Sequence, residues 1–205
     1  MGSLFLFACV IGSGIMAENL ASGNVAVALM GSTIATGAML FVLITMLGPI
    51  SGAHMNPAVS LVAAWRGELS WIDTLAYTGA QLAFGILGVW AAHLMFDLPA
   101  LQLSVKLRTG LGQWIAEAVA TFGLILTILG TVRHRPQWIS ASVALYITAA
   151  YWFTSSTSFA NPAITIARTL SDTFAGIAPH DAPIFILSQL IGAAFGTLAA
   201  RILFD

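Results

Sequence analysis

Charged side chains are scarce in this chain. Only 7% of its 205 residues are Asp, Glu, Lys or Arg, whereas 59% are hydrophobic. Soluble domains carry about 25% charged residues, so this chain cannot cover a water-facing surface, and its apolar content is far too high for disorder. A lipid bilayer is the solvent that fits this composition, and membrane lipid is the first expected partner.

Basic residues and cysteine are also few. Seven Lys and Arg against eight Asp and Glu leave a net charge of −1, which excludes a nucleic-acid-binding surface and a polybasic lipid-binding patch. The single cysteine, Cys9, excludes an intrachain disulfide, and the four histidines are too scattered for a metal site. We therefore expect no metal and no cofactor. The first apolar run has no charged segment before it and is interpreted as a membrane span rather than a cleaved signal.

Long apolar runs divide the chain into candidate membrane spans. A spanning helix needs about 20 apolar residues, so the chain has room for about six spans and for no separate soluble domain. Two shorter pieces, Asn56–Trp65 and Asn161–Leu170, measure only about 15 Å as helices, which is half a bilayer. Neither has the Lys- and Arg-rich face of an interfacial helix, so we interpret both as re-entrant. The six candidate spans cover residues 3–19, 25–47, 71–96, 111–132, 138–157 and 183–204, and a break is predicted at residues 48–54.

The sequence repeats itself. Gly-Ala-His-Met-Asn-Pro-Ala at residues 52–58 corresponds to Thr-Ser-Phe-Ala-Asn-Pro-Ala at residues 157–163. Gln81 follows Asn56 by 25 residues, and Gln189 follows Asn161 by 28. Each half, 1–96 and 111–205, therefore contains three spans and one half-helix. Because three is odd, the second half enters the membrane from the opposite side, and the special site of such an inverted repeat lies near the midplane.

Each Asn-Pro pair predicts the start of a half-helix. Asn is among the best N-cap residues, and Pro is preferred at the first helical position. Inversion brings the N-termini of the two half-helices together, and each carries roughly +0.5 of an elementary charge, which repels cations. The side-chain amides of Asn56 and Asn161 can still donate to the oxygen of a neutral solute. The extended segments before them offer carbonyl acceptors, and such backbone is tolerated at this depth where it lines a cavity.

Two Asn-Pro-Ala boxes in a six-span inverted repeat resemble the major intrinsic protein family, the aquaporins and aquaglyceroporins. The resemblance covers nearly the whole chain. It implies a single channel domain over residues 1–205, an all-α membrane protein with a right-handed six-helix bundle and two re-entrant half-helices. It also implies one pore per chain, a homotetramer, and passive flow of water or small neutral solutes. The pore motifs carried over from the family are Asn56, Pro57, Ala58, Asn161, Pro162 and Ala163.

The resemblance also implies a second constriction, the selectivity filter, toward the outer mouth. The family usually has Arg three residues after the second Asn, whereas this chain has Ile164. The expected filter residues are small or medium in size, uncharged and not aromatic, so we expect a wider and less polar filter. Carry-over places this filter at Thr36, Ala149, Ser158 and Ile164, with Ala150 as a near alternative to Ala149.

Small filter residues without the Arg are similar to those of bacterial channels encoded beside arsenic-resistance genes. That resemblance implies arsenite as neutral As(OH)3, and methylated arsenicals, among the solutes. The alternative is a water-selective aquaporin. A secondary transporter built on an inverted repeat is a further alternative, but coupled transport needs a titratable relay, and Glu117 is the only clear carboxylate in the spans. An enzyme is not expected, because no nucleophile–base pair or metal cluster is recognisable.

Several polar residues around the boxes have expected roles. Arg168 follows Ile164 by one helical turn and is expected either at the outer vestibule, where it attracts oxyanions, or paired with Asp172 or loop carbonyls. In the family, the carboxylate that corresponds to Glu117 accepts hydrogen bonds from a re-entrant loop. The remaining residues expected to support the loops are His54, Gln81 and Gln189.

Basic residues set the expected orientation. Arg66, Arg133, Arg135 and Arg201 fall on one side of the predicted topology, against Lys106, Arg108 and Arg168 on the other. The excess is small, and the short loop that holds Arg133 and Arg135 decides it, because such loops stay in the cytoplasm. We therefore expect a multi-pass protein of the inner cell membrane with both termini in the cytoplasm.

Overall fold

The computed structural model describes residues 1–204, and every regular element in that range is helical. Five helices have the length and apolar composition to cross a membrane. Two short helices begin at the predicted Asn-Pro pairs, with Asn56 and Asn161 as their N-caps. The elements are α1 (Gly2–Leu20), α2 (Val25–Ser51), α3 (Pro57–Trp65), α4 (Trp71–Met95), α5 (Leu111–His134), the 3-10 helix η1 (Pro136–Trp138), α6 (Ile139–Phe153), α7 (Pro162–Arg168) and α8 (Ala182–Phe204).

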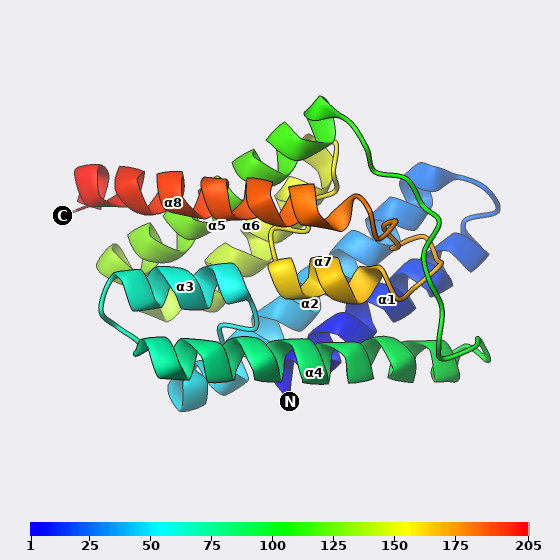
Figure 1. Ribbon diagram of the computed structural model, residues 1–205, viewed down its shortest axis with the longest axis horizontal. Helices are drawn as coiled ribbons and strands as arrows, with labels where there is room; N and C mark the ends of the chain where they lie inside the picture. Colours follow the sequence, from blue (N-terminus) through cyan, green and yellow to red (C-terminus); the bar gives the residue numbers. More distant parts are fainter. Residues whose placement is uncertain (205) are drawn as a thin grey trace.

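The two halves of the chain pack in the same way. α1 contacts α4 and α2, just as α5 contacts α8 and α6. The half-helices α3 and α7 lie end to end between α4 and α8 (Figure 1), and each contacts the last helix of both halves. Residues about 100 positions apart in the chain are thereby brought to one place in the middle of the molecule.

Two predicted boundaries are wrong. α2 runs through Gly48 and Pro49 and ends only at Gly52, whose φ of 69° is the left-handed C-cap conformation that glycine adopts readily. Pro49 lies in the last turn of α2, and because it has no N–H, the carbonyl of Thr45 lacks its usual donor within the helix. The span predicted at residues 138–157 is shorter, since α6 has 15 residues and ends before the extended residue Thr154.

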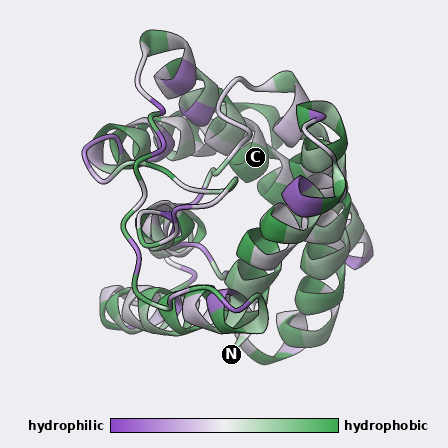
Figure 2. Ribbon diagram, turned by 90° about the vertical axis from the view of Figure 1, so that its right-hand side faces the viewer, coloured by the Kyte–Doolittle hydropathy of each residue, from purple (hydrophilic) through white to green (hydrophobic). Residues whose placement is uncertain are grey.

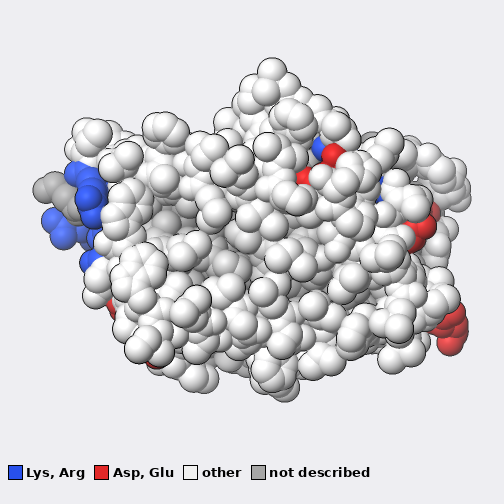
Figure 3. Space-filling model, in the orientation of Figure 1, with Lys and Arg blue, Asp and Glu red and all other residues white. Residues whose placement is uncertain are grey.

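The outer surface suits a lipid environment. The long helices are mainly apolar along their lengths (Figure 2), and large side chains such as Ile34, Leu145 and Phe195 point outward. The middle of the face in Figure 3 is nearly free of charged side chains, while Lys and Arg gather at the end that carries the C-terminus of α8. This distribution and the five long apolar helices make the chain a multi-pass membrane protein.

Glycines at matching places let the long helices pack closely. A Cβ on Gly88 of α4 would collide with the carbonyl oxygen of Leu4 on α1, and one on Gly192 of α8 with the carbonyl oxygen of Ala118 on α5. Small residues are what allow membrane helices to approach to this degree.

We expect Gly88→Ala and Gly192→Ala each to destabilise the protein by about 1–3 kcal/mol, because overpacking forces the backbones apart. Thermal unfolding in detergent measures this. Gly79→Ala is the control, since a Cβ at Gly79 on α4 has no atom within 4 Å. Equal unfolding midpoints for all three variants would contradict the close packing.

Candidate functional site: a cavity between the half-helices

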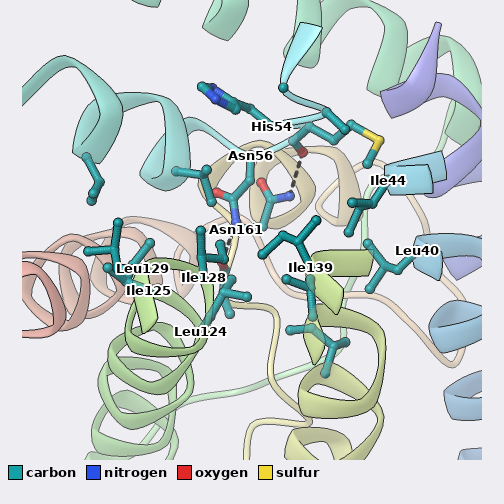
Figure 4. A pocket seen from close by; sticks show the side chains of 18 of the residues that line it. Leu40, Ile44, His54, Asn56, Leu124, Ile125, Ile128, Leu129, Ile139 and Asn161 are labelled. Atoms are coloured by element: carbon teal, nitrogen blue, oxygen red, sulfur yellow. Dashed lines mark hydrogen bonds between the residues drawn. The ribbon is translucent and has the colours of Figure 1, made fainter. Parts of the chain in front are cut away.

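A cavity of about 570 Å³ runs beside the tips of the half-helices. Residues spaced by four face it from α2 (Thr36, Leu40, Ile44) and from α6 (Ile139, Val143, Ile147, Tyr151), as expected for one side of a helix. Its wall is mostly apolar (Figure 4), with polar atoms contributed by the two loops before the half-helices. We call its two ends the Arg133 end (Arg66, Glu68, Arg133, Phe204) and the Arg168 end (Thr36, Tyr151, Ser158, Phe159, Ile164, Arg168).

Asn56 and Asn161 lie side by side on the wall of the cavity (Figure 4). Each side-chain oxygen caps its own half-helix, accepting from the N–H of Ala58 at 2.9 Å and of Ala163 at 3.0 Å. Each Nδ2 donates across the pseudo-twofold axis, Asn56 to the carbonyl of Ala160 at 2.8 Å and Asn161 to that of Met55 at 2.9 Å. An amide nitrogen carries two hydrogens, so each asparagine has one left for a molecule in the cavity.

The loops before the half-helices have unusual backbone conformations. Ala53 and Met55 in the first loop and Ser158 and Ala160 in the second all have φ between 45° and 49°. Non-glycine residues rarely adopt this left-handed region, so the surroundings must hold them there. The two matching pairs show that both loops follow one backbone path, in which carbonyl oxygens are available to the cavity and to the opposite asparagine.

Glu117 holds the second loop. Its fully buried carboxylate accepts from the backbone N–H groups of Phe159 at 2.8 Å and Ala160 at 2.9 Å, and from Nε2 of Gln189 at 2.6 Å. Charge-assisted hydrogen bonds of this kind are about twice as strong as neutral ones. Glu117 is therefore positioned as a structural anchor of the second loop.

Gln81 and Gln189 contact side-chain hydroxyl groups of the half-helices, although the sequence analysis expected them to support the loops. Gln81 donates to the hydroxyl of Ser60 at 3.1 Å and Gln189 to that of Thr165 at 2.9 Å, rather than to the loop backbone. Ser60 and Thr165 lie four residues after the two asparagines and bond back to their carbonyls. His54 also reaches Ser60, with Nδ1 3.2 Å from the hydroxyl oxygen. In the first half, Gln81 and His54 both contact Ser60. In the second half, Gln189 contacts the carboxylate of Glu117 in addition to Thr165.

Three of the four predicted filter residues line the Arg168 end of the cavity, namely Thr36, Ser158 and Ile164. Ala149 is wrong, because it is exposed on the outside of α6, and the alternative Ala150 is buried but does not line the cavity. Tyr151 takes this place instead, one turn beyond Ile147 on the cavity face. Its hydroxyl donates to that of Thr36 at 3.4 Å and so joins α6 to α2 at this end of the cavity.

Arg168 also lines this end together with Tyr151, so the wall here carries a charged and an aromatic side chain that the expected filter did not include. Its guanidinium stacks on the ring of Phe159, with Cζ 3.3 Å from the ring centroid, and Nε donates to the carbonyl of Ala175. Among residues 1–204 Asp172 forms no ion pair with Arg168, and its carboxylate accepts from the N–H of Val105. Arg168 therefore combines parts of both expected environments, because it lines the cavity and also donates to a loop carbonyl.

The arrangement suits passage of a neutral, oxygen-bearing molecule. Asparagine N–H groups and loop carbonyls face an otherwise apolar wall, so a solute with hydroxyl groups can exchange hydrogen bonds along one side. Within residues 1–204, no group of three His, Cys, Asp or Glu side chains is placed to hold a metal ion.

Comparison with known proteins identifies similar chains. Residues 1–155 match the family described as "Major intrinsic protein". Aquaglyceroporin AqpS of Rhizobium meliloti is 55% identical over 193 residues, 94% of this chain and 82% of that protein. Aquaporin A of Dictyostelium discoideum is 28% identical over 99% of this chain and 76% of its own length. The X-ray structure of the aquaglyceroporin from Plasmodium falciparum superimposes with a TM-score of 0.66 at 18% identity, covering 100% of this chain and 93% of that one, so the fold is aquaporin-like.

Proposed function

Because the chain belongs to the major intrinsic protein family, we propose that it is a passive channel for small uncharged solutes, conducting water, glycerol-like polyols and As(OH)3. The observation that carries the proposal is the pair Asn56 and Asn161, which lie together on the cavity wall with one amide hydrogen each to spare. The similarity to an aquaglyceroporin over most of the chain supports polyols over a strictly water-selective channel.

Solute size and chemistry support a trihydroxy compound. Glycerol and As(OH)3 both present three hydroxyl groups to one polar wall, and the apolar side chains of α2, α5 and α6 face the rest of the molecule. Methylated arsenicals would place a methyl group against the same apolar wall. The family usually has Arg at the position of Ile164. The shorter, uncharged side chain of Ile164 supports the passage of such solutes.

The direction of insertion and the assembly are also proposed. Arg66, Arg133 and Arg201 lie at the same end of the molecule, because Arg66 and Arg133 line one end of the cavity and Arg201 lies over Trp65. The excess of Arg at this end supports the proposal that it faces the cytoplasm, together with the C-terminus. We propose an inner-membrane homotetramer with one pore in each chain.

Stopped-flow measurements on proteoliposomes test the proposal. A channel should give water, glycerol, urea and As(OH)3 fluxes with a low activation energy and no dependence on a proton or sodium gradient. Saturating flux that follows a gradient would indicate a secondary transporter instead. Water flux without glycerol or As(OH)3 flux would indicate the water-selective alternative.

Tyr151 sets the width of the constriction in this account. We expect Tyr151→Leu to raise the glycerol permeability several-fold relative to that of water, because the ring and its contact with Thr36 are removed while an apolar side chain remains. Stopped-flow shrinkage of proteoliposomes measures both permeabilities. Trp152→Leu is the control, since its neighbouring ring is exposed and does not line the cavity. An unchanged ratio in Tyr151→Leu would remove Tyr151 from the constriction.

A further inference from the structure

Two arginines share one aromatic ring at the Arg168 end of the cavity. The guanidinium carbons of Arg168 and Arg108 lie 3.3 Å and 4.8 Å from the centroid of Phe159. Arg108 comes from the connection between α4 and α5, far from Arg168 in the sequence. Both side chains are buried, with 9% of Arg108 and 3% of Arg168 exposed. The fold therefore brings two like charges together away from water.

Neither guanidinium forms an ion pair with a carboxylate of residues 1–204. Arg108 donates to the carbonyls of Gly176 at 2.8 Å and Ser156 at 3.1 Å, and the partner of Arg168 is also a carbonyl. Carbonyl dipoles solvate a cation but do not neutralise it. Burying a charge without a counter-charge is costly, so the two arginines together leave a demand for negative charge.

The nearest carboxylates have other partners. Glu117 accepts the loop N–H groups and Gln189, as described above. Asp181 accepts from the backbone N–H of Arg108 at 2.7 Å and from the hydroxyl of Thr109 at 2.7 Å. Both lower the local potential without reaching a guanidinium. A third cation, Lys106, is also near, and burial together with repulsion from Arg108 and Arg168 lowers the pKa of Lys106 to about 8.

Two residues that line the Arg168 end of the cavity have hydrogen-bond donors without partners among the described residues. Within residues 1–204, the two terminal nitrogens of Arg168 have no hydrogen-bond partner, and Arg168 lines the cavity. Ser158 also lines the cavity, and its hydroxyl is buried among protein atoms without a hydrogen-bond partner in that range. A planar pair of guanidinium N–H groups matches two oxygens of one anion, and the hydroxyl of Ser158 supplies a third donor once its χ1 turns toward the cavity.

We propose that the Arg168 end of the cavity binds one small monovalent oxyanion, of the size of nitrate, between the guanidinium of Arg168 and the hydroxyl of Ser158. Arg108 is a positioning residue that adds positive charge and holds Phe159 in place. The bound anion occupies the constriction and competes there with neutral solutes. This second consequence rests on the proposed channel function, whereas binding itself does not.

Thermal unfolding of the detergent-solubilised protein tests binding directly. Sodium nitrate is compared with sodium gluconate at equal ionic strength, because gluconate is too bulky for the constriction. We expect nitrate at ten times its Kd to raise the unfolding midpoint by about 3–6 °C, and the rise to saturate. Arg168→Gln and Ser158→Ala should remove or reduce the rise, and Arg135→Gln, an exposed arginine at the opposite end, should retain it.

Glycerol flux into proteoliposomes provides the second readout. External nitrate should slow the wild-type flux saturably, with the same Kd as the thermal shift, and should not slow Arg168→Gln. If nitrate stabilises the wild type but the wild type carries no glycerol, the anion site stands and the channel proposal fails. If glycerol crosses while nitrate neither stabilises nor slows, the anion site is overturned. An equal thermal shift in Arg168→Gln, in Ser158→Ala and in the wild type also overturns it, because the effect is then one of the salt alone.

Discussion

Ile164→Arg is expected to lower glycerol and As(OH)3 permeability by about tenfold or more while reducing water permeability much less. The new side chain would lie on the cavity wall one turn before Arg168, close to Thr36 and Tyr151. It would narrow the constriction and bring a hydrated charge into the path, at a cost of at least about 1.4 kcal/mol for the larger solutes. Stopped-flow measurements of the three permeabilities on one preparation give the ratio.

Ile164→Leu is the matched control, because it keeps the volume and the apolar character of the position. Its permeabilities should stay close to those of the wild type. An equal loss for water, glycerol and As(OH)3 in Ile164→Arg would mean that the variant blocks or unfolds the pore as a whole. That result would remove Ile164 from the residues that discriminate between solutes.

Glu117→Leu is expected to destabilise the protein by about 3–5 kcal/mol. The substitution leaves the N–H groups of Phe159 and Ala160 and the amide of Gln189 buried without an acceptor, and each such group costs about 1–3 kcal/mol. Glu117→Gln keeps one acceptor oxygen and should cost less than Glu117→Leu. The order of the thermal unfolding midpoints in detergent should be wild type, Gln variant, Leu variant.

The control for this series is Glu68→Gln, a carboxylate that is half exposed and lies near Arg66 at the surface. Exposed ion pairs contribute about 0–1 kcal/mol, so its midpoint should barely move. A Glu117→Leu protein that unfolds within 1 °C of the wild type would show that the second loop keeps its conformation without the carboxylate.

Local chemistry made the half-helices predictable from the sequence. Asn56 and Asn161 are N-caps because their side chains accept from the first free N–H groups, and the prolines that follow cannot donate there. These effects act within three residues and do not depend on the rest of the fold. Both helix starts agree with the prediction to the residue.

The register of α6 was not predictable in the same way. Its outer face, including Leu145 and Trp152, is exposed on the surface of the molecule. Its inner face, including Val143 and Ile147, lines the cavity, and both faces are apolar. Without a difference in polarity between the faces, the periodicity cannot show which residue points inward. The sequence therefore predicts Ala149 for the filter, whereas Tyr151 is the α6 residue that lines the Arg168 end of the cavity.

The arginine pair also depends on information that local patterns do not contain. Arg108 lies in a connection without regular structure, and its contact with Phe159 joins residues 51 positions apart. The single signal in the sequence was the four-residue spacing between Ile164 and Arg168, which placed Arg168 near the constriction. Its stacking on Phe159 and the arrival of Arg108 required the tertiary structure.

Blocking of the cavity by a single cysteine tests most directly whether solutes pass beside the asparagines. In a Cys9→Ser background, Ile128→Cys places a thiol on the cavity wall, and Val119→Cys places one on the outer face of the same helix. We predict that mercuric chloride abolishes glycerol flux through proteoliposomes of Ile128→Cys, reversibly with added thiol, and leaves Val119→Cys unaffected. Full flux through Ile128→Cys after mass spectrometry has shown complete mercury labelling would contradict the account.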